Sequence, residues 1–237
     1  MAVTFTPKVQ WPENSLRLKA ADFGIKVPTG LSEVHLREPN FVDVTVMSAK
    51  SKEHAVGQGS ALSIVNGLVT RELDVTFAKE EQQWKELSGS KTGPGRFQFQ
   101  GGEIFLELQL AMYVIQHIKP DPKDKFSMQI FAEIYGHELL HVHDEVTLLD
   151  SLPDDLKGDA EISKLLTQPF TYGTNRQGMA VATAEFRDYI RKRIAGLVVN
   201  DHWAAKTNER ARRRDRPEEY QKVQDRIDTL RAQQINR

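Results

Sequence analysis

The chain has 237 residues, of which 39% are hydrophobic and 27% charged, with 32 Lys and Arg against 33 Asp and Glu. This length and apolar content allow a sizeable buried core and exclude a chain that is disordered throughout. Since the formal net charge is only −1, we expect no nucleic-acid partner. The sequence contains no cysteine, which excludes disulfides, thiolate metal sites and a cysteine nucleophile. A metal site in this chain must therefore use His, Asp and Glu.

The sequence has no apolar run of the ~18 residues that a membrane-spanning helix needs. Residues 1–10 lack the basic-then-apolar order of a secretion signal. We therefore expect a cytoplasmic protein, or one exported by a machine that reads no N-terminal signal.

Residues 1–93 are predicted to form a β-rich N-terminal region. Residues 41–47 alternate apolar and polar side chains, which is the period of a half-buried strand. Residues 62–69 and 73–77 show a similar pattern. The turn-rich segment 88–95, SGSKTGPG, is predicted to be a loop and marks the boundary of the next region.

Residues 94–200 are predicted to form the core domain, which begins with a sheet hairpin. Two alternating runs flank Gly101 and Gly102, and a two-residue glycine connection is typical of a tight hairpin. The second run covers residues 103–115, and its later part, from Leu108, also contains residues that favour a helix.

Three helices are predicted after the hairpin. The longest covers residues 127–149, because apolar side chains and two histidines recur there at helical spacing. We expect Pro153 and the aspartates after it to end this helix. A shorter helix is expected over residues 155–166, and a third over residues 179–199.

The sequence His137-Glu138-Leu139-Leu140-His141 fits the pattern HExxH and lies on the longest predicted helix. Histidines four residues apart on a helix are separated by about 6 Å along its axis, so both imidazoles can reach one metal ion. Glu138 projects beside that ion, where it can take a proton from a water molecule on the metal. Zinc suits such a site because it lowers the pKa of its water to ~7. The motif therefore predicts zinc at His137 and His141, with Glu138 as the general base.

Residues 134–142, IYGHELLHV, resemble the metal-binding helix of the zincin metallopeptidases. The resemblance covers this one helix and not the whole chain. It implies zinc, hydrolysis of peptide bonds, His137 and His141 as ligands, and Glu138 as the general base. It also implies a sheet whose edge strand binds the substrate backbone, and residues 103–115 are the candidate for that edge.

The third metal ligand separates the zincin subfamilies. The metzincin continuation, HExxHxxGxxH, fails here because Asp144 and Thr147 occupy the Gly and final His positions. Resemblance to the gluzincins implies a Glu from a later helix, and Glu185 is the preferred candidate. Asp188 lies near the position of an acid that hydrogen-bonds a zinc-bound imidazole in many gluzincins. Glu161 is the alternative, at a spacing that thermolysin-like enzymes use, although its surroundings lack their NExxSD pattern.

Asp144 is a further candidate because it shares a helix face with the histidines. It lies about 10 Å along the axis from His137, so orienting His141 fits it better than binding the same ion. His143 points away from this face and is expected to be structural or exposed. Zincins often stabilise the oxyanion with a Tyr, His or Arg. The downstream candidates, each of which also fits a packing or surface role, are Tyr172, Arg176 and Tyr189.

Residues 201–237 are predicted to form a charged helical C-terminal segment. A helix is predicted to start at Asp215, with Pro217 and Glu218 just after it. Five arginines between positions 210 and 216 can contact phosphates or an acidic partner, but the neighbouring acids favour a solvated helix face.

Together these patterns predict an α+β protein. Its zincin-like domain would comprise a sheet hairpin, the HExxH helix and a downstream ligand helix, preceded by the β-rich region. The predicted function is zinc-dependent hydrolysis of a peptide or protein substrate. Two alternatives remain open: an exported toxin or effector with a peptidase domain of this kind, and a non-catalytic interaction protein with a zincin-like body.

Overall fold

The computed structural model describes residues 3–55, 66–78, 84–88, 95–172 and 179–235. These residues form helices and β-sheets, so the predicted α+β class is confirmed. None of the described helices is long and apolar enough to cross a membrane.

Contacts divide the chain into two compact units, each assembled from three separate segments. The first unit comprises Met1–Lys8, Leu73–Leu108 and Leu149–Ala205, and the second comprises Val9–Glu72, Gln109–Leu148 and Lys206–Arg237. The division into regions 1–93, 94–200 and 201–237 stays a prediction. The second unit contains the HExxH motif together with most of the charged C-terminal segment.

A four-stranded sheet is built around β6 (Gly102–Ile115). The strands that pair with β6 are β1 (Val3–Gln10), β2 (Asn40–Val42) and β3 (Gly67–Phe77). β2 runs parallel to β6. β3 runs antiparallel, since the Ile115 N–H donates to the Asn66 carbonyl and the Ala78 N–H donates to the Glu103 carbonyl. β6 is a strand over its whole length and lies inside the sheet, so the prediction that it is the substrate-binding edge is wrong.

A separate antiparallel sheet has the order β4 (Trp84–Ser88), β5 (Gly95–Phe99) and β7 (Phe170–Tyr172). The predicted hairpin is therefore wrong, because β5 and β6 both exist but belong to different sheets. Gly101 and Gly102 take φ values of 104° and 148°, which glycine adopts at little cost. They bend the chain from one sheet into the other. Alternation within a strand predicts the strand but not its partner.

The predicted strand at residues 41–47 is mostly helix. After β2 ends at Val42, the Asp43 carboxylate accepts a hydrogen bond from the Val46 N–H at 2.9 Å. This contact caps the first turn of α2 (Val44–Ala55) and outweighs the alternating pattern. β3 contains the predicted strand at 73–77 and the end of the predicted strand at 62–69. Residues 62–65 and most of the loop predicted at 88–95 lie outside the described residues.

The HExxH motif lies on α4 (Lys125–Gly158), which includes Pro153 and runs beyond its predicted end. An interior proline costs a helix ~3 kcal/mol. Leu152 and Leu156, on either side of Pro153, are almost fully buried, and this burial offsets the cost. α4 packs against β2 through Phe131, whose ring centroid lies 6.1 Å from that of Phe41.

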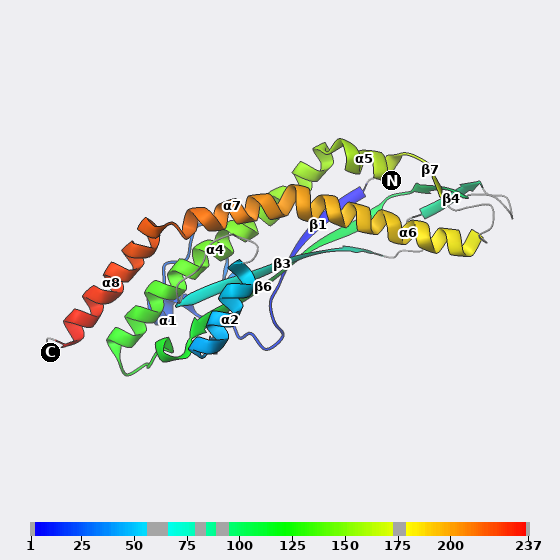
Figure 1. Cartoon of the computed structure of the whole chain (residues 1–237). Helices are drawn as coiled ribbons and strands as arrows, with labels where there is room; N and C mark the ends of the chain where they lie inside the picture. The colour runs from blue at the N-terminus through cyan, green and yellow to red at the C-terminus, as the bar shows by residue number, and fades with distance from the viewer. Residues whose placement is uncertain (1–2, 56–65, 79–83, 89–94, 173–178, 236–237) are drawn as a thin grey trace. The chain divides into compact units, whose positions relative to one another are not determined.

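The remaining helical segments are α1 (Ala20–Phe23), the 3₁₀ turns η1 (Glu33–His35) and η2 (Gln116–Ile118), α5 (Ala160–Thr167), α6 (Met179–Gly196), the π-helical η3 (Leu197–Ala204), α7 (Ala205–Arg214) and α8 (Pro217–Ile235). The predicted helices at 155–166 and 179–199 correspond to α5 and α6. Within the second unit, α7 and α8 run beside α4 (Figure 1). This arrangement brings the C-terminal segment to the HExxH motif.

Candidate metal centre

The structure brings the two predicted imidazoles together on one face of α4. The ring centroids of His137 and His141 are 5.2 Å apart, and the rings are nearly perpendicular, at 79°. Both residues are buried, with 9% and 8% of their surface exposed. Their one-turn separation is a direct consequence of the i, i+4 spacing in a helix.

Asp215 brings a carboxylate to both imidazoles from the turn between α7 and α8. Its Oδ1 lies 3.7 Å from Nε2 of His137 and 3.1 Å from Nε2 of His141. Within the described residues, these three form the one group of His, Asp and Glu whose ligand atoms converge, all within 4.8 Å of one another. In a tetrahedral zinc site, ligand atoms are about 3.4 Å apart. The donor types and their spacing are therefore compatible with those of a zinc site.

The charges of this group depend on its internal hydrogen bonds. Burial favours the neutral form of Asp215, but hydrogen bonds from His137 and His141 outweigh it and lower the pKa of the carboxyl well below 3.8. Burial likewise favours neutral His141, but the hydrogen bond to Asp215 and the charge of Glu138 raise its pKa above 6.5. Without a metal, His141 and Asp215 thus form an ion pair below the raised pKa of His141. A cation that binds there must replace the proton.

Glu138 is 5% exposed, and its carboxylate packs against the start of β3. A Cβ added to Gly67 would lie 2.5 Å from Oε1 of Glu138, so glycine is required at this close approach. Burial raises the pKa of Glu138 and the charge of Asp215 adds to this, while the two histidines oppose it. A carboxylate with a raised pKa is well suited to accept and return a proton near neutral pH.

Tyr220, near the start of α8, adds a hydroxyl to the site. Its ring centroid lies 6.1 Å from that of His137, with the rings at 84°. Together with Gly67, His137 and Glu138 it lines one small pocket. Burial raises the pKa of Tyr220, and its hydroxyl is hydrogen-bonded to the Asn66 backbone. The hydroxyl therefore keeps its proton at neutral pH and remains a hydrogen-bond donor.

Arg214, the residue before Asp215, forms an ion pair that fixes the position of the Asp215 carboxylate. Arg214 binds Asp144 of α4 through two contacts, Nε to Oδ2 at 2.7 Å and Nη2 to Oδ1 at 2.9 Å. The predicted role of Asp144 in orienting His141 is therefore replaced by a role in holding α7. Its neighbour His143, at 3.5 Å, contacts the same carboxylate.

A second, buried connection joins α4, β3 and α7. Oε1 of Glu145 lies 3.2 Å from Nε of Arg71, and both side chains are at most 5% exposed. The Thr207 hydroxyl donates to the same oxygen, and Arg71 donates to Asn208 at 3.3 Å. Breaking a buried ion pair leaves an uncompensated charge, so these contacts hold α7 firmly beside α4.

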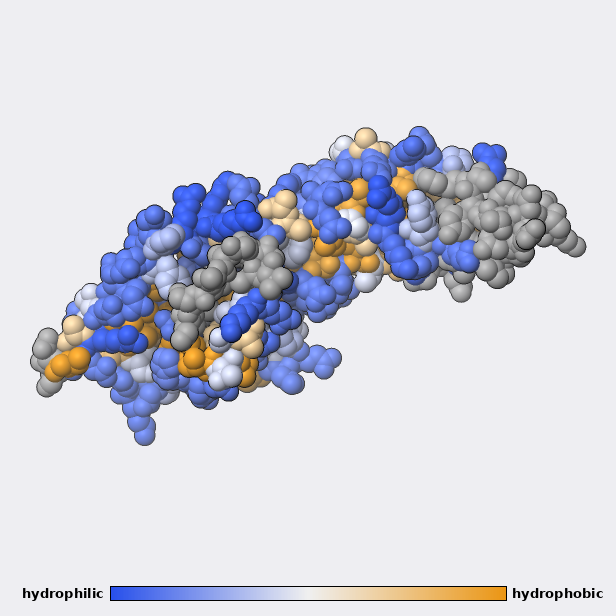
Figure 2. Space-filling view, viewed as in Figure 1, coloured by the Kyte–Doolittle hydropathy of each residue, from blue (hydrophilic) through white to orange (hydrophobic). Residues whose placement is uncertain are grey.

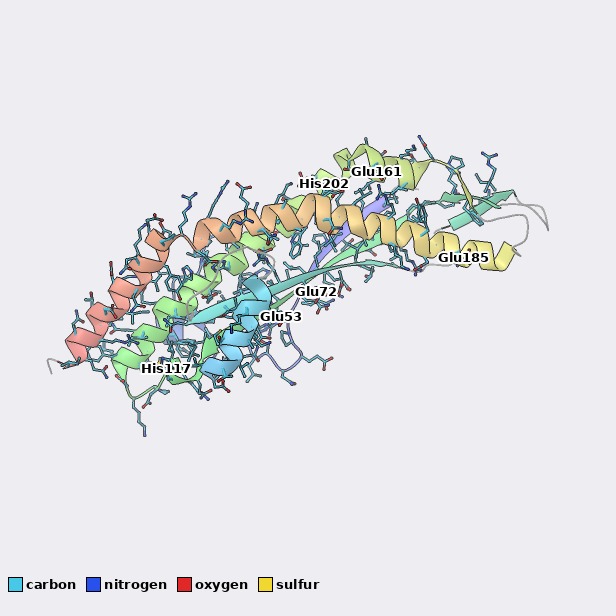
Figure 3. All side chains as sticks on the ribbon, in the orientation of Figure 1. Glu53, Glu72, His117, Glu161, Glu185 and His202 are labelled. Atoms are coloured by element: carbon cyan, nitrogen blue, oxygen red, sulfur yellow. The ribbon has the colours of Figure 1, made fainter. Side chains whose placement is uncertain are left out.

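The acids predicted as downstream ligands lie in the first unit. Glu185 is an exposed side chain on α6, and Glu161 lies on α5, where it pairs with Arg193 (Figure 3). Asp188 pairs with Lys192 at 2.8 Å. Within the described residues, the ligand group that contains His137 and His141 includes Asp215 and none of these three acids.

Of the three predicted oxyanion stabilisers, the structure describes the side chain of one. Tyr189 is 47% exposed on α6, in the first unit. Arg176 and the side chain of Tyr172 lie outside the described residues. Sequence reasoning missed Asp215 and Tyr220 because both lie in the charged C-terminal segment. The signal that could have identified Asp215 is its position as an acid just before Pro217, between two helices. The sequence analysis interprets this position only as the start of a helix.

In comparisons with protein-family models, with curated proteins and with solved structures, no match to this chain is found. The resemblance to zincins therefore depends on the HExxH segment.

Proposed function

We propose that this chain is a zinc-dependent metallopeptidase in which His137, His141 and Asp215 bind the metal and Glu138 is the general base. The observation that supports this is the convergence of three ligand atoms beside a buried glutamate from the same motif. Asp215 takes the role for which sequence analysis preferred Glu185. A zinc ion in this position would supply Lewis acidity toward a peptide carbonyl.

The residues of the chain supply the remaining chemistry of hydrolysis. Glu138 accepts a proton from the attacking water and returns it to the leaving amine, so the general base also serves as the general acid. Tyr220 lines the same small pocket as Glu138 and would donate a hydrogen bond to the oxyanion that develops at the carbonyl. This hydroxyl replaces the candidates Tyr172, Arg176 and Tyr189 in our proposal.

The substrate backbone would bind beside β3 in place of β6. β3 begins at Gly67, directly against the Glu138 carboxylate, and among the described strands it pairs with β6. An extended peptide that adds to the other side of β3 would pass the general base.

A zinc titration against a chromophoric chelator tests the ligand set, with Asp215→Ala compared with Glu185→Ala and Glu161→Ala. Removing a direct ligand is expected to weaken binding more than ~100-fold, which exceeds the loss typical of an outer contact. We expect this loss for Asp215→Ala and wild-type affinity for the other two variants.

Three other results would change the proposal. If Glu185→Ala loses zinc while Asp215→Ala keeps it, the ligand set predicted from sequence is correct and ours is wrong. If wild-type protein binds no zinc, His141 and Asp215 form only a structural ion pair. If zinc binds but peptide pools are not hydrolysed, the non-catalytic alternative replaces the peptidase.

A further inference from the structure

A pocket of about 600 Å³ adjoins the candidate metal centre, between α4 and the α7–α8 turn. His137 lies in its wall, so a molecule in this pocket contacts the residue proposed to bind the metal. The residues that line the pocket are His137, Leu140, Asp144, Thr147, Arg210, Arg213, Arg214, Arg216 and Glu219. All of them belong to the second unit.

The lining of this pocket is positively charged. The lining contains four arginines and two acids. Both acids already form ion pairs, because Asp144 binds Arg214 and Glu219 binds Lys222. Figure 2 shows that the surface over the α7–α8 turn is strongly hydrophilic. A zinc ion at the neighbouring site would add positive charge. An anion in the pocket is therefore favoured over a neutral or cationic group.

The four arginines differ in how far they are committed to other contacts. Arg214 uses Nε and Nη2 on Asp144, and Arg213 pairs with Glu209. Arg210 is half-buried and uses one nitrogen on the Asp144 carbonyl. Arg216 is exposed, and within the described part of the chain no acid pairs with it. Arg210 and Arg216 thus have donors left for a ligand.

We propose that this pocket binds a carboxylate of the substrate, held by Arg210 and Arg216 next to the bond that is hydrolysed. This inference rests on the proposed peptidase function. Arginine binds carboxylates through parallel N–H donors, and a carboxylate is the anion that a peptide itself carries. The carboxylate belongs either to an acidic side chain or to the C-terminus of the substrate.

The test uses three pools of short fluorescent peptides. They carry a fixed Glu with an amidated C-terminus, a fixed Gln with an amidated C-terminus, or the same Gln with a free C-terminus. Hydrolysis is measured with wild-type protein. Binding is measured by fluorescence anisotropy with Glu138→Gln, with and without added zinc. Preference for the first pool assigns the pocket to a side-chain carboxylate, and preference for the third assigns it to the C-terminus.

Arg216→Glu is the informative variant, and Arg212→Glu is its matched control. Arg212 is also exposed and lies near the end of α7, but it does not line the pocket. We expect Arg216→Glu to reduce the preference for the carboxylate-bearing pool by about tenfold, and Arg212→Glu to change it by less than about twofold. Arg216→Lys should retain part of the preference, and unchanged melting temperatures verify that the variants fold.

The results distinguish this inference from the proposed function. Hydrolysis without a preference for carboxylates, or an equal effect of the two charge reversals, overturns the pocket assignment and leaves the peptidase proposal in place. Carboxylate binding that depends on Arg216, with no hydrolysis, overturns the peptidase and retains the pocket. The absence of both overturns both.

Discussion

Replacing Gly67 by Ala should damage the site through a single contact. The added methyl group would lie 2.5 Å from Oε1 and 2.8 Å from Cδ of Glu138. Ordinary contacts of this kind need at least about 3.5 Å, so the carboxylate must move by roughly 1 Å. Glu138 is 5% exposed, and its neighbours Tyr135 and Leu139 on α4 are fully buried, which limits how far the carboxylate can move.

This overpacking should lower the free energy of unfolding by about 1–3 kcal/mol. It should also reduce any hydrolysis roughly 100-fold, because a general base displaced by 1 Å is no longer aligned. Urea unfolding and the melting temperature measure the first effect, and the peptide-pool assay measures the second. Zinc affinity should remain near wild type, since the three atoms nearest to the new methyl group all belong to Glu138, which is not one of the proposed ligands.

Gly136→Ala is the matched control. Gly136 lies on α4 beside His137, and a Cβ added there would meet nothing within 4 Å beyond its chain neighbours and the backbone of its own helix. Alanine in a helix is favoured over glycine by about 0.5–1 kcal/mol, so this variant should be slightly stabilised. In a Glu138→Ala background the clash is absent, and Gly67→Ala should no longer destabilise. Wild-type stability and hydrolysis in Gly67→Ala would refute the packing of Glu138 against β3.

The remaining predictions concern the charges around the site. Glu138→Gln should keep zinc binding and lose ~100-fold or more of hydrolysis, and activity within a few-fold of wild type would remove the general base from the mechanism. Asp144→Asn should weaken the contact with Arg214, lower stability by about 1 kcal/mol and reduce zinc affinity, as measured by unfolding and zinc titration. Because the pKa of His141 is raised, its protonation stabilises the metal-free fold below pH 6.5, and this stabilisation is lost as pH rises through the raised pKa. The melting temperature of metal-free protein should therefore fall above pH 6.5, and Asp215→Asn should largely remove the fall.

Strand partners were not predictable from local patterns in this chain. The runs on both sides of Gly101 and Gly102 are strands, as their alternation indicates, yet β5 pairs with β4 and β7 while β6 is central to another sheet. At residues 41–47 the alternation was overridden by Asp43, whose side chain caps α2. Hydrogen bonds to residues distant in sequence decide which strands pair with β5 and β6. One capping contact decides that most of residues 41–47 form a helix.

The sequence alone determined the part of the candidate site that a single helix builds. His137, Glu138 and His141 share α4, and helix geometry places residues at i and i+4 on one face whatever surrounds them. The zincin resemblance likewise comes from this one segment.

Only the tertiary structure decided which acid joins the two histidines. Asp215 reaches them because Arg214 binds Asp144 and Thr207 binds Glu145, contacts that hold α7 beside α4 and set the turn before α8. No local period encodes such long-range contacts, so sequence analysis preferred Glu185 over Glu161 as the third ligand and interpreted Asp215 only as the start of a helix. Packing between helices that are far apart in the chain decides which acid lies beside the histidines, because the Asp215 carboxylate comes from a turn whose position depends on those contacts.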